Sequence, residues 1–342
     1  MDIKTAIRKL TLGQNLNRDE MTAVMRDIMS GNSTDAQNAA FLVALQMKGV
    51  KVDELLGGAT VMRELVTAVK VAPGPHLVDT CGTGGSGSNK FNVSTAAALV
   101  AACAGARVAK HGNRGASSKS GSADVLEAAG VNLALTPEQV AETIEKLGVG
   151  FMFAPSHHSA MRHVITARRE IGVRTIFNLL GPLTNPAAAP NQVMGVFEPN
   201  WIEPLLNVFK AMGSSHVLVV SSEDGLDEIS IAADTRVGEL RDGHISQYRV
   251  SPEDFGMKRY PDIDMLRIQN VEQSLALLRQ ALGGQPGAAV DIVALNAGAA
   301  IYAANLAGDL KSGVAQAQEV IRSGRALEKL DELARFTQAF AR

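Results

Sequence analysis

Residues 79–89 read Asp-Thr-Cys-Gly-Thr-Gly-Gly-Ser-Gly-Ser-Asn, and they lie between an expected strand at 77–80 and an expected helix at 94–105. Backbone N–H groups at such a turn, together with the helix N-terminus, make a site for anions. Glycines let that backbone approach phosphate oxygens with no Cβ in the way. A flexible linker is the alternative, but linkers do not normally occupy a strand-to-helix turn. The stretch therefore predicts a phosphate-binding loop.

Two common nucleotide-binding motifs do not fit this loop. Gly82, Gly84 and Gly87 match the dinucleotide pattern G-x-G-x-x-G, but that pattern also needs an acidic residue after the second strand. Here the second expected strand, 107–110, is followed by His-Gly-Asn-Arg, so cations stand where the carboxylate should be. The Gly-Lys-Ser/Thr sequence of a P-loop is also missing.

A second candidate loop is Lys-His-Gly-Asn-Arg-Gly-Ala-Ser-Ser, residues 110–118. Lys110 and Arg114 bring two positive charges, and an asparagine and two serines add neutral donors. Together these groups suit a pyrophosphate, which has several oxygens to satisfy. A solvated basic turn is the alternative interpretation. The glycine and serine content, and the expected position facing the first loop, favour the pyrophosphate site.

A third element, Ser-Ser-Glu-Asp-Gly-Leu-Asp-Glu at 221–228, follows an expected buried strand. It should therefore lie at the carboxyl edge of the sheet, beside the other two loops. Asp227 and Glu228 offer hard oxygen ligands, which suit Mg²⁺ held jointly by protein and substrate phosphates. Alone, the segment would be interpreted as an acidic turn facing water. Its combination with two phosphate loops favours a Mg²⁺ site.

The pattern of elements changes at Pro-Gly-Pro, residues 73–75. Before it we expect three short helices and no strands. The first is capped by Asn17 and Glu20 and ends near residue 31, the second covers 34–49, and the third is capped by Asp53 and runs to residue 65. After it strands and helices alternate, and the last seventy residues are again helical and rich in alanine. The expected strands are 77–80, 107–110, 149–154, 193–197 and 217–221, and the expected helices 94–105, 122–130 and one from 136. Such alternation predicts an α/β fold, a mostly parallel sheet flanked by helices.

The segment 160–191 is less regular and suits a crossing between domains or a hinge. It contains a basic helix at 163–171. Arg168 could receive a carboxylate, although a surface ion pair is its ordinary fate. His157 and His158 could bind a metal, but no acidic or cysteine partner stands at a useful spacing.

Composition excludes several classes of protein. The net charge of −2 provides no field for nucleic acid or anionic membrane, and 4% aromatic residues are too few to stack single-stranded nucleic acid. The two cysteines, Cys81 and Cys103, exclude a disulfide scaffold or a zinc ribbon. Neither a signal peptide nor a membrane span is apparent, so we expect a cytoplasmic protein.

Four stretches closely resemble the anthranilate phosphoribosyltransferase family: 79–95, 110–122, 176–186 and the pair Asp227-Glu228. The resemblance covers most of the chain. It implies a small all-helical domain hinged to a large α/β domain, with boundaries at 1–72 plus about 165–188, and at 73–164 plus 189–342. It also implies a homodimer formed through the helical part. The implied substrates are 5-phosphoribosyl 1-pyrophosphate (PRPP) as donor and anthranilate as acceptor, with Mg²⁺ as cofactor.

The resemblance also implies roles for individual residues. Lys110, Asp227 and Glu228 would be catalytic, and Ser94 would hold Mg²⁺ with Asp227 and Glu228. Anthranilate would meet Gly82, His111, Asn113, His158 and Arg168. The donor would meet the Gly-rich loop, the start of the next helix, the basic loop and the following turn: Gly82, Gly85, Ser86, Lys90, Asn92, Val93, Ser94, Thr95, Lys110, His111, Gly112, Asn113, Arg114, Gly115, Ala116, Ser117, Ser118 and Ser122.

Three positions depart from the family pattern. Ser86 stands where aspartate is frequent, Lys90 where a small hydroxyl residue is frequent, and Ser159 where proline often follows the second histidine. These departures bear on donor affinity and on the Mg²⁺ requirement rather than on the type of reaction.

Three other functions remain open on the residues alone. A pyrimidine nucleoside phosphorylase has a similar fold but would use phosphate and would not need Asp227 and Glu228. A nicotinamide-dependent oxidoreductase would need an acidic residue to bind the ribose, and this sequence lacks that residue after the second strand. A nucleotide-binding module without turnover is the third.

Overall fold

The computed structural model describes residues 1–84, 87–115 and 118–341. In these residues a seven-stranded sheet has the order β3-β2-β1-β4-β5-β6-β7. The first five strands of that order are parallel, and β6 and β7 are antiparallel. The strands are β1 Leu77–Asp79, β2 Arg107–Gly112, β3 Val149–Phe153, β4 Asn191–Gly195, β5 His216–Ser222, β6 Thr235–Arg241 and β7 His244–Val250. The predicted α/β class with a mostly parallel sheet is confirmed.

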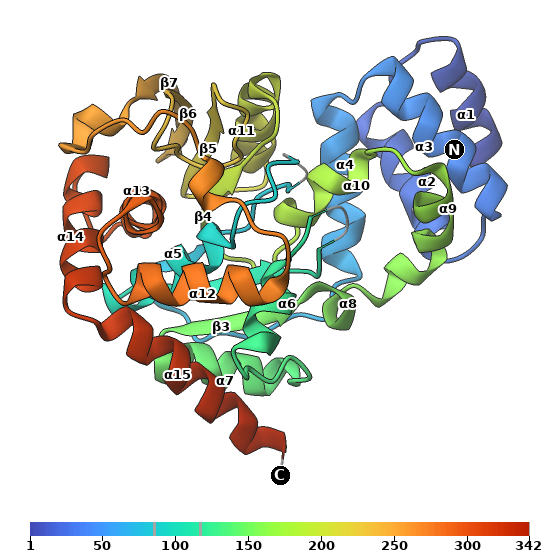
Figure 1. The fold of residues 1–342 in the computed structure, drawn as a ribbon. Helices are drawn as coiled ribbons and strands as arrows, with labels where there is room; N and C mark the ends of the chain where they lie inside the picture. The colour runs from blue at the N-terminus through green and yellow to red at the C-terminus, as the bar shows by residue number, and fades with distance from the viewer. Residues whose placement is uncertain (85–86, 116–117, 342) are drawn as a thin grey trace.

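An N-terminal group of helices lies at one side of the sheet (Figure 1, blue). Two of its helices begin with capping boxes, in which Asn17 and Glu20, and then Thr34 and Gln37, exchange side-chain and backbone hydrogen bonds as the sequence predicts. Two helices from the middle of the chain join the group, because α9 packs on α3 and α10 on α4. Its members are α1 Ile3–Thr11, α2 Arg18–Met29, α3 Asp35–Lys48, α4 Val52–Glu64, α9 Ile165–Ile171 and α10 Ile176–Leu180.

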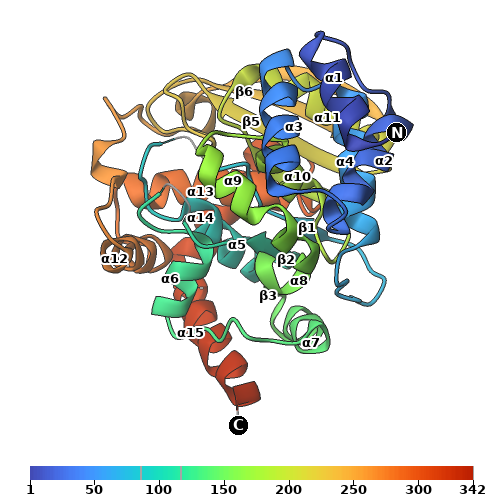
Figure 2. The same ribbon diagram turned by 90° about the vertical axis from the view of Figure 1, so that its right-hand side faces the viewer.

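Among the remaining helices, α5, α7, α11 and α13 pack directly on the sheet, and α14 and α15 pack on helices of this layer. Helix α15 leads to the C-terminus at the bottom of both views (Figures 1 and 2). Thr136 and Gln139 form a third capping box at the start of α7, with Pro137 in its first turn. The helices are α5 Val93–Cys103, α6 Ser122–Ala128, α7 Pro137–Leu147, α8 Ala154–His157, α11 Ile202–Ala211, α12 Val271–Leu282, α13 Ala288–Ala303, α14 Leu310–Arg322 and α15 Arg325–Gln338. Short 3₁₀ turns occupy Ser159–His163, Gly181–Leu183, Pro199–Trp201, Pro252–Phe255, Asp264–Leu266 and Ala339–Ala341.

Alternate residues of β5 face two different cores, as the pleat of a strand requires. Leu218 and Val220 belong to a core with the alanine-rich helices α5 and α13. Val217 and Val219 belong to a second core with α11 and the N-terminal helices. The sheet is therefore covered on both faces, and the ends of its strands are the places left for a site.

Three details differ from the sequence prediction. A further helix, α1, precedes those expected. The fourth helix is capped at Lys51, and Asp53 lies in its first turn rather than at its cap. The hairpin of β6 and β7 was not predicted, although its turn contains Asp242-Gly243, a typical two-residue hairpin signal, with φ of 49° and 78°. Across the described residues, no helix has the length and hydropathy that crossing a bilayer requires.

Candidate active site

The three predicted loops line one cavity of about 660 Å³ at the carboxyl ends of the parallel strands. Gly84 comes from the loop after β1, Lys110 from the end of β2, and Asp227 from the loop after β5. Helices α9 and α10 supply the opposite wall through Arg168 and Phe177. The convergence of the three loops, on which the functional interpretation depends, is therefore present in the structure.

Gly195, at the end of β4, holds two of these loops together. Its carbonyl accepts hydrogen bonds from the backbone N–H and the side-chain hydroxyl of Thr83, at 2.9 and 3.1 Å. A Cβ added at Gly195 would overlap the backbone carbonyl of Asp227, and one added at Gly82 would come within 2.9 Å of the Gly195 oxygen. The Gly-rich loop, β4 and the acidic segment thus approach so closely that only glycine fits.

Lys110 is buried, with its ammonium directed at the base of the Gly-rich loop. It donates to the carbonyl and hydroxyl oxygens of Thr80, at 3.2 and 3.1 Å, and to the hydroxyl of Ser94 at 3.3 Å. Burial lowers the pKa of Lys110, and the neighbouring Asp79 carboxylate acts in the opposite direction. Among the described residues no carboxylate forms an ion pair with Lys110, so its charge is available to an anion in the cavity.

The basic loop is folded back on α6 by one carboxylate. Asp124 accepts hydrogen bonds from the backbone N–H of Gly115 and Gly121, at 2.9 and 2.8 Å. Arg114 is exposed and pairs with Asp124 at 3.1 Å and with Glu127 at 2.7 Å. Arg114 was predicted to meet the donor, but its guanidinium is engaged by α6, although the residue lines the cavity.

Asn92 fixes the junction between the first loop and α5. Its side-chain oxygen accepts from the hydroxyls of Ser120 and Ser274, both at 2.7 Å, and its amide donates to the Ser120 carbonyl at 3.2 Å. Asn92 therefore links the basic loop to the start of α5 and to α12.

The acidic pair is bound by a lysine. The Lys90 ammonium lies 2.6 Å from Asp227 Oδ1 and 2.6 Å from Glu228 Oε2. Burial raises the pKa of Glu228 to about 7, and Lys90 acts in the opposite direction. Asn296 of α13 holds the following segment, because its amide group exchanges two hydrogen bonds with the backbone of Ile229, both 2.9 Å long.

Two neutral histidines lie beside the loops. The ring centroids of His111 and His158 are 5.1 Å apart. Burial lowers the pKa of His111 to about 3 and that of His158 to about 4. Both ring nitrogens of His111 and the Nε2 of His158 are buried and have no hydrogen-bond partner among the described residues. Such orphaned polar atoms at a cavity can receive the polar groups of a ligand.

Arg168 and His157 differ in their relation to the cavity. Arg168 lines it, with its guanidinium 5.1 Å from the ring centre of Phe177, and pairs with no carboxylate in the described part of the chain. His157 instead bonds the carbonyl of Thr67 at 2.8 Å, which identifies it as a structural residue.

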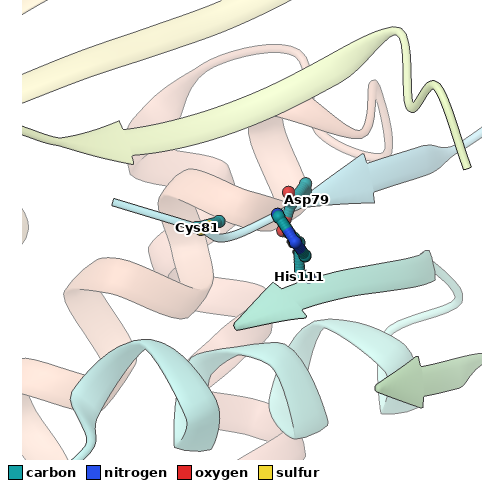
Figure 3. Close-up of side chains that lie close together, drawn as sticks. All are labelled: Asp79, Cys81 and His111. Carbon is teal, nitrogen blue, oxygen red and sulfur yellow. Dashed lines mark hydrogen bonds between the residues drawn. The ribbon is translucent and has the colours of Figure 1, made fainter. Parts of the chain in front are cut away.

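Asp79, Cys81 and His111 bring one ligand atom each within 4.8 Å of one another (Figure 3). The sequence did not predict this cluster. Burial raises the pKa of the Cys81 thiol, which therefore stays protonated. The Asp79 carboxylate already accepts from the amide of Asn185 at 2.6 Å and from the backbone of His111 at 3.2 Å. The cluster therefore fits Mg²⁺ poorly, because that ion prefers oxygen ligands.

Most of the predicted site residues line the cavity. Thr95 does not, because it points away from it into the packing between α5 and the sheet. Gly85, Ser86, Ala116 and Ser117 lie outside the described residues. The predicted residues that line the cavity are Gly82, Lys90, Asn92, Val93, Ser94, Lys110, His111, Gly112, Asn113, Arg114, Gly115, Ser118, Ser122, His158, Arg168, Asp227 and Glu228.

Sequence reasoning missed several lining residues. Asn178 and Pro182 belong to a segment that was interpreted as a hinge and as similar to the family, but its residues were given no role in the site. Gln192 joins that segment to the first loop, because its amide donates to the carbonyls of Cys81 and Pro182, both at 3.0 Å. Two signals in the sequence could have marked this region, namely Gly195 at the end of the apolar strand β4 and Gln192 inside that strand.

Family comparison defines the class of protein. Residues 74–327 match the glycosyl transferase family, a/b domain, and residues 4–66 match the helical bundle domain of the same family. Fold and site together are those of a glycosyltransferase.

Similar proteins narrow this class. The anthranilate phosphoribosyltransferase of Thioalkalivibrio sulfidiphilus is 60% identical over 337 residues, which are 98% of this chain and 99% of the relative. The enzyme of that name from Hahella chejuensis is 58% identical, with 99% of each chain covered. The chain belongs to the anthranilate phosphoribosyltransferase family, and the resemblance found in the sequence is confirmed.

Solved structures agree with this assignment. The crystal structure of anthranilate phosphoribosyltransferase from Thermus thermophilus has a TM-score of 0.91 at 46% identity, covering 97% of this chain and 99% of its own. The Saccharomyces cerevisiae enzyme, in complex with PRPP and Mg, shares the fold with a TM-score of 0.89 at 24% identity, and 98% of each chain is covered.

Proposed function

We propose that the chain transfers the phosphoribosyl group of PRPP to the amine of anthranilate, giving N-(5-phosphoribosyl)anthranilate and pyrophosphate. The observation that carries the proposal is the single cavity lined by the Gly-rich loop, the basic loop and the acidic pair. A relative named for this reaction is 60% identical over 98% of this chain. A phosphorylase would not need the acidic pair that the cavity contains.

The donor's diphosphate is assigned to the space between the first two loops. Gly82, Ser118 and Ser122 line this space, and the Lys110 ammonium lies at its base. Loop amides and one buried cation match the several oxygens of a diphosphate. The remaining donor-binding residues keep the roles implied by the family resemblance, including those outside the described residues.

Mg²⁺ fits the acidic side of the cavity. Ser94, Asp227 and Glu228 line the cavity and offer hard oxygen ligands there. A cation, the Lys90 ammonium, already lies against the two carboxylates. When bound, Mg²⁺ supplies positive charge that stabilises the departing pyrophosphate.

Anthranilate is assigned to the wall formed by the histidines and α9. Arg168 is a half-buried cation without an acidic partner among the described residues, which suits the carboxylate of anthranilate. Neutral His111 and His158 present polar ring atoms without adding charge. Gly82 of the Gly-rich loop and Asn113 of the basic loop also line the cavity, and we assign them to the same acceptor.

The chain's residues act mainly by positioning. The aromatic amine of anthranilate is already a neutral nucleophile, so no strong general base is needed. The harder step is loss of pyrophosphate from the anomeric carbon, and Lys110 with the loop amides stabilises that developing charge. Closure of the helical part over the cavity would orient the substrates and exclude water.

The assembly and domain division are proposed on the same basis. The helical domain comprises 1–72 plus about 165–188, and the α/β domain 73–164 plus 189–342, which the packing of α9 and α10 on α3 and α4 supports. We place a homodimer contact on the helical domain, where Leu12 and Met47 are 70% and 84% exposed. Cys81 and Cys103 are both free thiols, which suits the cytoplasm.

The fluorescence of anthranilate tests this function directly. With PRPP and Mg²⁺ the signal should fall, and it should stay constant without either. Asp227→Asn should lower kcat by about a hundredfold or more. Asp242→Asn is the matched control, because Asp242 is 85% exposed on the β6–β7 turn and asparagine tolerates its φ of 49°. No loss of anthranilate, or phosphorolysis of a nucleoside instead, would contradict the proposal.

A further inference from the structure

Lys90 and the acidic pair line the cavity and contact each other there. The Lys90 side chain is 10% exposed, and those of Asp227 and Glu228 are 8% and 11% exposed. The ammonium donates a hydrogen bond to Asp227 Oδ1 and forms an ion pair with Glu228 Oε2, both at 2.6 Å. One cation thus offsets one of the two negative charges and reduces the repulsion between two adjacent carboxylates that lie away from bulk water.

The backbone of Lys90 is fixed by strand-like pairing. Lys90 forms an isolated bridge with Arg267. On either side, the N–H of Phe91 donates to the Leu266 carbonyl at 3.0 Å, and the N–H of Ile268 donates to the Asn89 carbonyl at 2.8 Å. The side chain therefore starts from a fixed anchor, and its four-carbon stem can reorient while the backbone stays in place.

The ammonium uses the oxygens that a divalent cation would need. Mg²⁺ binds oxygen at about 2.0–2.1 Å and demands a regular arrangement of ligands. An ammonium in contact with the same two carboxylates would lie a few Å from that ion, where like charges repel strongly. The two cations therefore exclude each other from Asp227 and Glu228.

We propose that Lys90 is an internal counter-ion that competes with Mg²⁺ for Asp227 and Glu228. It holds the acidic pair in the substrate-free protein and leaves when the metal enters. The released ammonium remains in the cavity lining, where the donor's phosphates are the anions available to it. The inference rests on the proposed function, because that function assigns Mg²⁺ to this pair.

Manganese binding to the full-length protein without substrates tests the competition. Lys90→Met removes the ammonium and keeps much of the side-chain length, and electron paramagnetic resonance measures free Mn²⁺. We expect Lys90→Met to bind Mn²⁺ about tenfold more tightly than the unaltered chain, or more, within the usual range for coupled sites. Lys90→Arg, which keeps the charge, should bind like the unaltered chain. Adding Asp227→Asn to Lys90→Met should abolish the gain.

Equal Mn²⁺ affinity in Lys90→Met and the unaltered chain would overturn the proposal, as would a gain that survives Asp227→Asn. If Lys90→Met does not fold, Lys90→Gln serves the same comparison with a polar side chain. Thermal unfolding adds a second readout, since Mg²⁺ should raise the Tm of the neutral variants more than that of the unaltered chain. The anthranilate assay tests the transfer reaction separately, so failure of the reaction and failure of the competition are distinguishable.

Discussion

Gly195→Ala tests whether close backbone approach sets the geometry of the site. The added methyl would overlap the carbonyl of Asp227, so either the acidic segment or the end of β4 must move. The Gly195 carbonyl also holds Thr83, so the shift would reach the Gly-rich loop. We expect a displacement on the order of 1 Å, which costs about a hundredfold in catalysis.

That loss corresponds to about 2.7 kcal/mol of transition-state stabilisation. Overpacking should also lower the free energy of unfolding by about 1–3 kcal/mol, too little to unfold a domain of ordinary stability. The assay is the initial rate of anthranilate loss at saturating PRPP and Mg²⁺, with thermal unfolding measured in parallel. Gly308→Ala is the matched control, because nothing lies within 4 Å of the added methyl and the backbone there needs no positive φ. Gly195→Ala with kcat within threefold of the unaltered chain would refute the reasoning.

Three further predictions concern buried charge. Lys110→Met should lower kcat by about a hundredfold or more with the fold retained, measured by anthranilate fluorescence, because it removes the buried cation facing the departing diphosphate. Lys48→Met should lower the free energy of unfolding in urea by about 3–5 kcal/mol, because it strands Glu54, which Lys48 contacts at 2.6 Å with side chains 3% and 0% exposed. Burial lowers the pKa of His111 to about 3 and of His158 to about 4, so below about pH 6.5 the unfolded chain binds more protons than the native one. Stability should fall from pH 6.5 to 4 by up to about 1.4 kcal/mol per pH unit for each histidine.

Matched variants isolate each effect. Lys210→Met, at an exposed position of α11, should leave kcat unchanged. Adding Glu54→Gln to Lys48→Met should recover part of the lost stability, and no recovery would argue against a stranded charge. His111→Asn should flatten the pH dependence of unfolding relative to the unaltered chain. An identical slope in both proteins would show that His111 titrates in the native state, contrary to the prediction.

The local architecture of the site can be predicted from the sequence, because the signals that specify it lie close together in the chain. The glycines of 79–89 and the apolar run before them predict a strand, a turn and a helix N-terminus without knowledge of the rest of the chain. The carboxyl ends of parallel strands meet at one edge, so three such loops predict one cavity. The structure agrees on both points.

The side-chain contacts inside the cavity could not be predicted from the sequence, because they join residues that are far apart in the chain. The ion pair of Lys90 with Asp227 spans 137 positions, and the sequence indicated only that Lys90 was unusual for the family. Arg114 was assigned to the donor from its charge, but two acids on α6 compete for its guanidinium. The hairpin of β6 and β7 was not predicted, because the interpretation followed the alternation of strands and helices that indicates a parallel sheet. The turn signal of the hairpin, Asp242-Gly243, was nevertheless present in the sequence.

A crystal structure of the protein with PRPP and Mn²⁺ tests the central claim most directly, since anomalous scattering identifies the metal. We expect a diphosphate between the Gly-rich and basic loops, near Lys110, and a Mn²⁺ peak beside Ser94, Asp227 and Glu228. A donor bound outside this cavity, or a metal bound elsewhere while the acidic pair stays on Lys90, would contradict it.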